Sequence, residues 1–254
     1  MAKEAKNAVK SIETAFDVLD ALVELDGAGS TELARHFGMP KSTVHNYLST
    51  LLQEELVVKD GSTYRVGIRF LEYGAYARQR LNIFEIANPE VDKLAESTGE
   101  LANLMIEEHG RGSYLHRARG EDAVRVEAHV GTRVPLHSTG LGKAILAHLP
   151  DERVEEIIDE HGLKQFTPNT ITDRERLFTE LREIHDSGLA FDEEERLRGL
   201  RCVAAPILSN NGRVLGAVSV SGPTNRVRGD YLEDELAQRL KETVNVIELN
   251  VTYS

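Results

Sequence analysis

Residues 30–66 read STELARHFGMPKSTVHNYLSTLLQEELVVKDGSTYRV, and this stretch decides the fold of the first part of the chain. Its first eight residues have helical apolar spacing, and Gly38 is placed to end that helix because glycine readily takes the left-handed conformation. Met39-Pro40 forms a turn into a second helix. Asp60-Gly61 lies between two short β-like runs and predicts a hairpin. Helix, turn, helix and hairpin together predict a winged helix-turn-helix, which places one helix in the DNA major groove.

The second helix of this motif, from residue 41 onward, carries short polar side chains outside its apolar face. Thr43 and Asn46 can reach base edges, and asparagine is well shaped for adenine. Ser42 and the helix start suit a phosphate. The predicted DNA-contacting residues are Arg35, Lys41, Ser42, Thr43, His45, Asn46, Tyr47, Lys59 and Arg65. A winged helix that contacts another protein, or a purely structural bundle, is the alternative.

The charge of the chain argues against nucleic acid as a partner, since its net charge is −12. Residues 1–66 hold seven basic and ten acidic residues, so even this part is acidic. We therefore expect few phosphate contacts, a shallow salt dependence of DNA binding, and affinity that comes mainly from groove contacts and dimerisation. High acidity also suits a salty cytoplasm, where the Debye length falls to about 3 Å at 1 M. A halophilic source is therefore a hypothesis.

Composition excludes several other classes. The 254 residues are 41% hydrophobic, which is enough for one or two globular domains. No apolar run approaches the roughly 18 residues of a membrane span, and the N-terminus lacks a signal-peptide pattern, so a cytoplasmic location is expected. The single cysteine, Cys202, excludes an internal disulfide and a multi-cysteine zinc site. We expect no metal and no cofactor.

The rest of the chain predicts a linker and a second domain. Residues 67–87 are expected to form one linker helix whose Phe70, Gly74, Ala77 and Leu81 suit a dimer seam, unless that helix packs on its own domain. Asn88-Pro89 is expected to break this helix. Further patterns predict helices over 90–98, 140–148, 151–160, 173–187 and 229–250, and strands over 101–107, 112–117, 123–130, 202–208 and 214–221. The prediction is an α+β fold with helices against an antiparallel sheet, divided into 8–66, 67–87 and 88–254.

Four features of the second domain suggest a binding site. The glycine-containing turn before residue 141 opens a helix, whose free amides favour an anion, although a plain capped helix start has the same pattern. Ser219 and Ser221 share one face of a strand and need hydrogen-bond partners, which a ligand or the backbone can supply. Asp192 follows Phe191 and can point inward, although the acidic run 192–195 also suits a solvated face. Cys202 is either a small buried apolar residue or a nucleophile.

Taken together, these segments resemble the IclR family of transcriptional regulators. The matching segments are 39–45 (MPKSTVH), 64–67 (YRVG), 136–144 (LHSTGLGKA), 188–194 (GLAFDEE), 199–206 (GLRCVAAP) and 218–223 (VSVSGP). The resemblance implies a winged helix joined by a linker helix to a GAF-like effector-binding domain, in dimers or dimers of dimers that sense small metabolites. It also implies the effector-pocket residues Gly140, Leu141, Asp192, Leu200, Cys202, Ser219 and Ser221. Gly140 departs from the other small residues common there, which bears on ligand shape.

The function predicted is that of a ligand-responsive, DNA-binding regulator of metabolic genes, acting on a palindromic double-stranded operator, and not that of an enzyme. Serine hydroxyls and helix-start amides can hold a carboxylate, whereas an ionised Asp192 repels one and suits a hydroxyl. A hydroxylated carboxylic acid is therefore the expected effector. The rivals are an enzyme that uses Cys202, which lacks a second, resolving cysteine, and a winged-helix module that binds protein.

Overall fold

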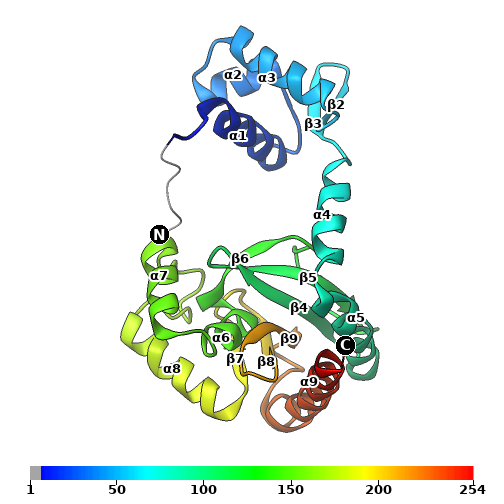
Figure 1. The fold of residues 1–254 in the computed structure, drawn as a ribbon, viewed down its shortest axis with the longest axis vertical. Helices are drawn as coiled ribbons and strands as arrows, with labels where there is room; N and C mark the ends of the chain where they lie inside the picture. The colour runs from blue at the N-terminus through cyan, green and yellow to red at the C-terminus, as the bar shows by residue number, and fades with distance from the viewer. Residues whose placement is uncertain (1–6, 254) are drawn as a thin grey trace. The chain divides into compact units, whose positions relative to one another are not determined.

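The computed structural model describes residues 7–253. Its contacts divide the chain between Ala77 and Arg78 into two compact units, each described by itself below. Figure 1 shows the elements of both.

The N-terminal unit is a winged helix-turn-helix, as predicted. Its elements are α1 (Lys10–Glu24), β1 (Ala28–Gly29), α2 (Ser30–Phe37), α3 (Lys41–Gln53), β2 (Val57–Asp60), β3 (Thr63–Val66) and most of α4 (Phe70–Gln79). Gly38 ends α2 with φ +62°, which glycine adopts without strain. The antiparallel sheet has the order β1-β3-β2, so that β2 and β3 form the predicted wing.

The core of this unit lies between α1, α2, α3 and β3. Val18, Leu33, Val44 and Leu48 are fully buried there. The apolar residues of these helices are not all buried, since Leu52 of α3 is 39% exposed. On α1, Leu19 and Leu22 point inward, but other apolar residues remain exposed. These are Ile12, Phe16 and Val23.

The prediction of one linker helix over 67–87 is wrong. Helix α4 ends at Gln79, and α5 runs from Asn82 to Thr98, straight through the expected break at Asn88-Pro89. The reason is packing, because α5 buries one continuous apolar face in the second unit. That face comprises Ile83, Ala87, Val91, Leu94 and Ala95. Burial of this face outweighs the hydrogen bond that Pro89 cannot donate.

The C-terminal unit is built on a six-stranded antiparallel sheet in the order β6-β5-β4-β9-β8-β7. The strands are β4 (Leu101–Glu108), β5 (Arg111–Arg119), β6 (Arg133–Pro135), β7 (Ala190–Glu193), β8 (Leu200–Leu208) and β9 (Val214–Pro223). The strand predicted over 123–130 is wrong, since these residues form an irregular connection and none of them is buried. The short β6 takes the place beside β5 instead.

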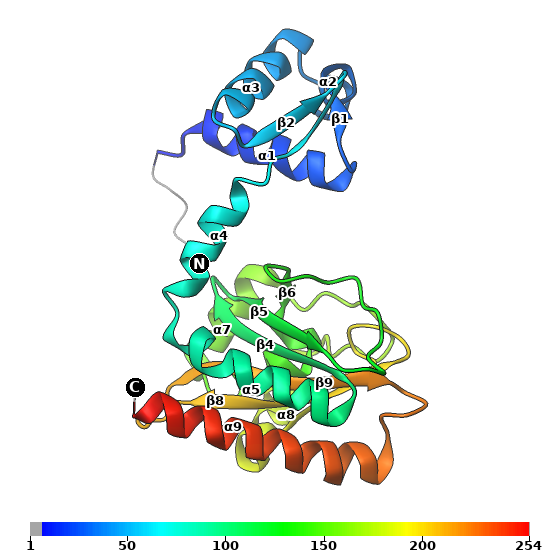
Figure 2. The same cartoon turned by 90° about the vertical axis from the view of Figure 1, so that its right-hand side faces the viewer.

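Helices cover both faces of the sheet, so the α+β prediction is confirmed. One face carries α5 together with the helical segment η2 (Tyr231–Leu236) and α9 (Ala237–Thr252), and Figure 2 shows α5 and α9 side by side along the sheet. The other face carries η1 (Leu136–Ser138), α6 (Gly140–Leu146), α7 (Asp151–His161) and α8 (Arg174–Ser187). Val218 and Val220 of β9 point to the α5–α9 layer. Ser219 and Ser221 therefore face the α6 layer.

Candidate effector site and nucleic-acid interface

The sheet register gathers the predicted effector residues beneath the start of α6. Asp192 pairs with Cys202, which in turn pairs with Ser221, so the three side chains form a row across β7, β8 and β9. Gly140 lies directly above this row, since a Cβ on it would be 2.8 Å from the Cys202 sulfur. The structure thus brings these four residues together.

The other predicted pocket residues lie around the same row. Ser219 is fully buried and occupies the next inward position on β9. Leu200 is half-buried at the start of β8, on the face of Cys202. Leu141 is 2% exposed and packs into the apolar layer of α6, α7 and α8. Effector binding by all seven residues stays a prediction.

A second polar row crosses the sheet beside the first, and the sequence reasoning missed most of it. The Arg117 Nε donates to Asn103 Oδ1 at 3.0 Å, and Asn103 Nδ2 donates to Ser219 Oγ at 3.3 Å. Asn103 is 3% exposed and interrupts the otherwise apolar strand 101–105. A single polar residue in an apolar strand is the sequence signal that could have identified Asn103, since a buried amide requires hydrogen-bond partners.

We call the two polar rows, together with Gly140 above them, the chamber. Tyr114 lies among its charged groups. Burial raises its pKa to about 12, and the charges of Cys202, Arg117, Asp192 and Arg196 also act on it. The guanidinium carbon of Arg117 lies 5.4 Å from the Tyr114 ring centre. A shift in strand register between Leu104 and Met105 places Tyr114 and Arg117 on one face, although they are three residues apart.

Asp192 points inward and is 5% exposed. Its Oδ1 accepts a 2.7 Å hydrogen bond from the Glu195 backbone N–H. Burial, reinforced by the charge of Glu195, raises the Asp192 pKa to about 7. Near neutral pH the carboxyl is therefore partly protonated, and its repulsion of an acidic ligand is reduced.

Cys202 is not prepared for nucleophilic chemistry. Burial raises the pKa of its thiol well above the ordinary value, and the charge of Asp192 raises it further. A thiol that stays protonated is a weak nucleophile. In the chamber it instead supplies a small, soft surface under Gly140.

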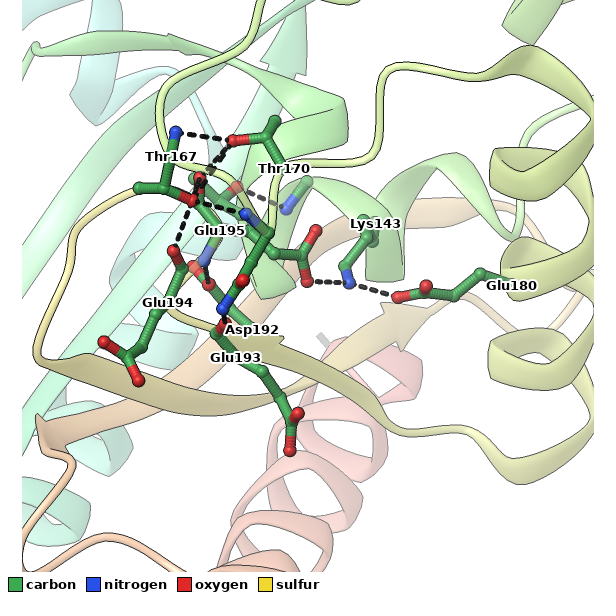
Figure 3. Close-up of polar contacts among 11 residues, drawn as sticks. Lys143, Thr167, Thr170, Glu180, Asp192, Glu193, Glu194 and Glu195 are labelled. Atoms are coloured by element: carbon green, nitrogen blue, oxygen red, sulfur yellow. Dashed lines mark hydrogen bonds and ion pairs between the residues drawn. The ribbon is translucent and has the colours of Figure 1, made fainter.

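Lys143 of α6 forms a buried ion triad beside the chamber (Figure 3). Its side chain is fully buried, and its Nζ donates to Glu180 of α8 and to Glu195, which follows β7. Burial alone would lower the Lys143 pKa, but the charges of Glu195 and Glu180 outweigh this and raise it. Lys143 is therefore charged and ties α6 to both neighbours.

The turn that carries Glu195 is held from the opposite side as well. Thr170 Oγ1 donates to the Glu195 carbonyl at 2.6 Å, and Thr167 Oγ1 donates to the Glu194 carbonyl at 2.7 Å (Figure 3). Residues 192–196 are thus fixed between α6, α8 and the 167–170 loop.

The predicted DNA-contacting residues lie on and around α3 and the wing. Seven are exposed, namely Arg35, Lys41, Ser42, His45, Asn46, Lys59 and Arg65, whereas Thr43 and Tyr47 are half-buried. The ring Nδ1 of His45 lies 3.2 Å from Ser49 Oγ, and the Lys59 ammonium lies 5.2 Å from the Tyr64 ring centre. Four of these residues are cations, namely Arg35, Lys41, Lys59 and Arg65. Within residues 7–77 none of them forms an ion pair with a carboxylate of that range. Their charges are therefore available to phosphate.

Two other kinds of site are not found in the part of the chain that the structure describes. Residues 7–253 contain no group of three or more His, Cys, Asp or Glu side chains placed to hold a metal ion. None of the helices among them has the length and apolar character needed to cross a membrane.

A winged helix-turn-helix joined to an α+β unit with a row of buried polar side chains under α6 defines a class, that of DNA-binding regulators with an effector domain. Residues 11–61 match the IclR helix-turn-helix domain, and residues 75–249 match the bacterial transcriptional regulator IclR C-terminal domain. The chain belongs to the IclR family of transcriptional regulators. This is a family of DNA-binding regulators and not of enzymes, so the rival reading of Cys202 as a catalytic nucleophile is wrong.

Individual relatives cover nearly the whole chain. It is 34% identical over 249 residues to the probable HTH-type transcriptional regulator ArcR of Halobacterium salinarum, covering 96% of this chain and 94% of that protein. It is 36% identical to the regulator BhcR of Paracoccus denitrificans, covering 88% and 81%. The crystal structure of Thermotoga maritima IclR is 31% identical and has a TM-score of 0.78, covering 97% of this chain and all of that one.

Proposed function

We propose that the chain binds a palindromic operator as a homodimer or a dimer of dimers, and that a small organic acid in the C-terminal chamber controls this binding. The observation that carries the proposal is the pair of surfaces just described, an exposed polar face on α3 and a buried polar chamber under α6. Effector binding then shifts the population between dimer geometries with different half-site spacing. Because its partner is the genome, we place the protein in the cytoplasm.

DNA contact by α3 is tested by footprinting across the gene neighbourhood of this protein. We expect a roughly palindromic protected site. Asn46→Ala is expected to weaken binding by about 1–3 kcal/mol and to relax specificity at one base pair, whereas Lys41→Ala weakens all sequences alike. Gln53→Ala, at the far end of the same helix, is the matched control. Equal losses for the Asn46 and Gln53 variants would contradict groove entry by the start of α3.

The salt dependence of DNA binding tests the contact surface. Four cations per protomer limit the slope of log K against log salt to about −3.6 for each protomer. These are Arg35, Lys41, Lys59 and Arg65. A much steeper slope would mean that other cations contact the phosphates.

Exposed apolar residues in the N-terminal unit support a second copy of the chain as partner. No residue of α4 is buried, and Leu71 is 63% exposed. Helix α1 exposes Phe16 to 58%. Large apolar side chains exposed on one unit are candidates for a protein interface. We expect Phe16→Glu with Leu71→Glu to lower the mass measured by sedimentation to that of a monomer, while Val58→Glu, on the wing, does not.

The chemistry of the chamber supports a hydroxylated carboxylic acid as effector. The Gly142 amide at the start of α6 already donates to Thr139 Oγ1. The Ser219–Asn103–Arg117 row can instead form hydrogen bonds to the polar groups of an acid, and Asp192 suits a hydroxyl. A thermal-shift panel of hydroxylated acids and their deoxy counterparts tests this. We expect the hydroxylated acids to raise the melting temperature, and Ser221→Ala to reduce the shift. A panel in which only non-hydroxylated acids stabilise the protein would overturn the proposal.

A further inference from the structure

Arg196 carries a hydrogen-bond donor with no partner. Its Nη1 is buried and makes no hydrogen bond within the described chain. The guanidinium carbon lies 3.9 Å from the Phe166 ring centre, so the aromatic ring fixes the plane of the group. The backbone of the preceding residue, Glu195, is held by the contacts described above. The donor is therefore both unsatisfied and held in place.

Arg196 also lacks a direct ion-pair partner. Among residues 7–253 it takes part in no ion pair within 4.0 Å. The adjacent acid, Asp192, directs Oδ1 to the Glu195 N–H instead. A half-buried cation without a carboxylate in direct contact costs free energy that an anionic ligand can recover.

Arg196 borders the chamber of the predicted effector residues. The charges of Tyr114 and Asp192 act on its pKa, which burial lowers, so all three groups share one environment. Phe166, on which Arg196 stacks, lies 6.4 Å from the His137 ring, and His137 belongs to the short helix that leads into α6. The guanidinium thus stacks on Phe166 and lies near Tyr114 and Asp192.

We propose that Arg196 binds the carboxylate of the effector through its planar guanidinium, while the rest of the acid reaches the Ser219–Asn103–Arg117 row. The inference rests on the proposed function, since it presumes an acidic effector. It adds the residue that recognises the acid group and the requirement for an ionised carboxylate. Arginine meets a carboxylate with two parallel N–H···O bonds, which lysine cannot reproduce.

The test compares each acid with its own primary amide, namely lactate with lactamide, gluconate with gluconamide, and benzoate with benzamide. Thermal shift on the full chain identifies the acids that bind, and calorimetry gives their affinities. We expect the hydroxylated acids to bind and none of the amides to bind. Arg196→Gln should weaken the affinity for the best acid about 10- to 100-fold, and Arg196→Lys by less. Arg198→Gln, an exposed neighbour, is the matched control.

Two results separate the inference from the proposed function. An acid that binds the wild type and the Arg196→Gln variant equally overturns the role of Arg196 and leaves acid sensing in place. A panel without any stabilising acid overturns both. Phe166→Leu provides a second variant, because it removes the stacking surface without touching the charge, and it should weaken acid binding several-fold. Urea midpoints of the ligand-free variants show whether each still folds.

Discussion

Lys143 brings a full positive charge into the interior of the C-terminal unit. Its partners differ in burial, since the Glu195 side chain is 7% exposed and that of Glu180 29%. Removing the ammonium leaves a buried carboxylate without a counter-ion, which costs more than the ion pair itself contributes.

Lys143→Met is therefore expected to lower the free energy of unfolding by about 3–5 kcal/mol, as measured by urea denaturation. Lys93→Met is the control, because Lys93 pairs with Glu90 at the surface with its side chain 68% exposed. That variant should change stability by less than about 1 kcal/mol. Similar losses of unfolding free energy in the two variants would show that burial of the ion triad does not cause the loss in Lys143→Met.

Asp192 should make the stability of the protein depend on pH. Its pKa is about 7 when folded and 3.8 in the reference state, so the folded protein binds the additional proton between these values. The stability that this proton contributes to the folded state is complete below about pH 4 and is lost as the pH rises toward 7. Relative to Asp192→Asn, the wild type should lose about 3–5 kcal/mol between pH 4 and pH 8. Asp230→Asn, at an exposed position, should show no such trend. A constant difference between wild type and Asp192→Asn would contradict the raised pKa.

At the residue scale, only part of the chamber was predictable from the sequence. Ser219 and Ser221 follow from strand period, and Asp192 follows from the motif that resembles the family. Tyr114 and Arg117 do not, since only a register shift places residues three apart on one strand face. Arg196 lies in a loop whose direction depends on tertiary contacts.

Among the elements, α6 shows how closely a helix can lie on a sheet. Gly140 has no side chain because the sulfur of Cys202 occupies the space that a Cβ would need. Such contact leaves the start of the helix over the row of polar residues. An added methyl must either move α6 or displace the cysteine.

Gly140→Ala is accordingly expected to destabilise the protein by about 1–3 kcal/mol. Cys202→Ala in the same chain should relieve most of this loss, because it removes the atom that the methyl meets. A double-mutant cycle measured by urea denaturation gives the coupling, expected at about 0.5–3 kcal/mol. If the effects of Gly140→Ala and Cys202→Ala simply add, the contact between these two positions is not the source of the lost stability. Gly162→Ala is not a suitable control, because Gly162 has φ +67° and the change would strain the backbone.

The helices and strands were largely predictable where a regular apolar pattern ended at a clear turn or helix-ending residue. The wing and α2 are of this kind, with Asp60-Gly61 and Gly38 as their signals. The linker was not, because Pro89 signals a break locally while Ile83 and Val91 bury one face across it. The 123–130 segment alternates like a strand but stays irregular, and β6 pairs with the start of β5 instead.

At the scale of the whole molecule, the net charge of −12 favours expansion through self-repulsion. Salt screens this repulsion, so the melting temperature should rise between 0.1 and 1 M KCl, by roughly 2–4 °C for each kcal/mol gained. Replacing the exposed Glu121, Glu127 and Glu183 by glutamine should reduce the gain. A melting temperature that falls with KCl would show that attractive ion pairs outweigh the repulsion, and would remove the basis for the halophilic hypothesis.

Every residue of α6 from Gly140 to Leu146 is buried. This has a consequence for anyone who wishes to convert the protein into a biosensor for another metabolite. Substitutions in α6 disturb the packing of the whole unit, so a library placed there would consist mostly of unfolded variants. Diversity is better placed at Phe166 and Arg196, which are only half-buried and belong to loops. New recognition can be selected there while the scaffold stays intact.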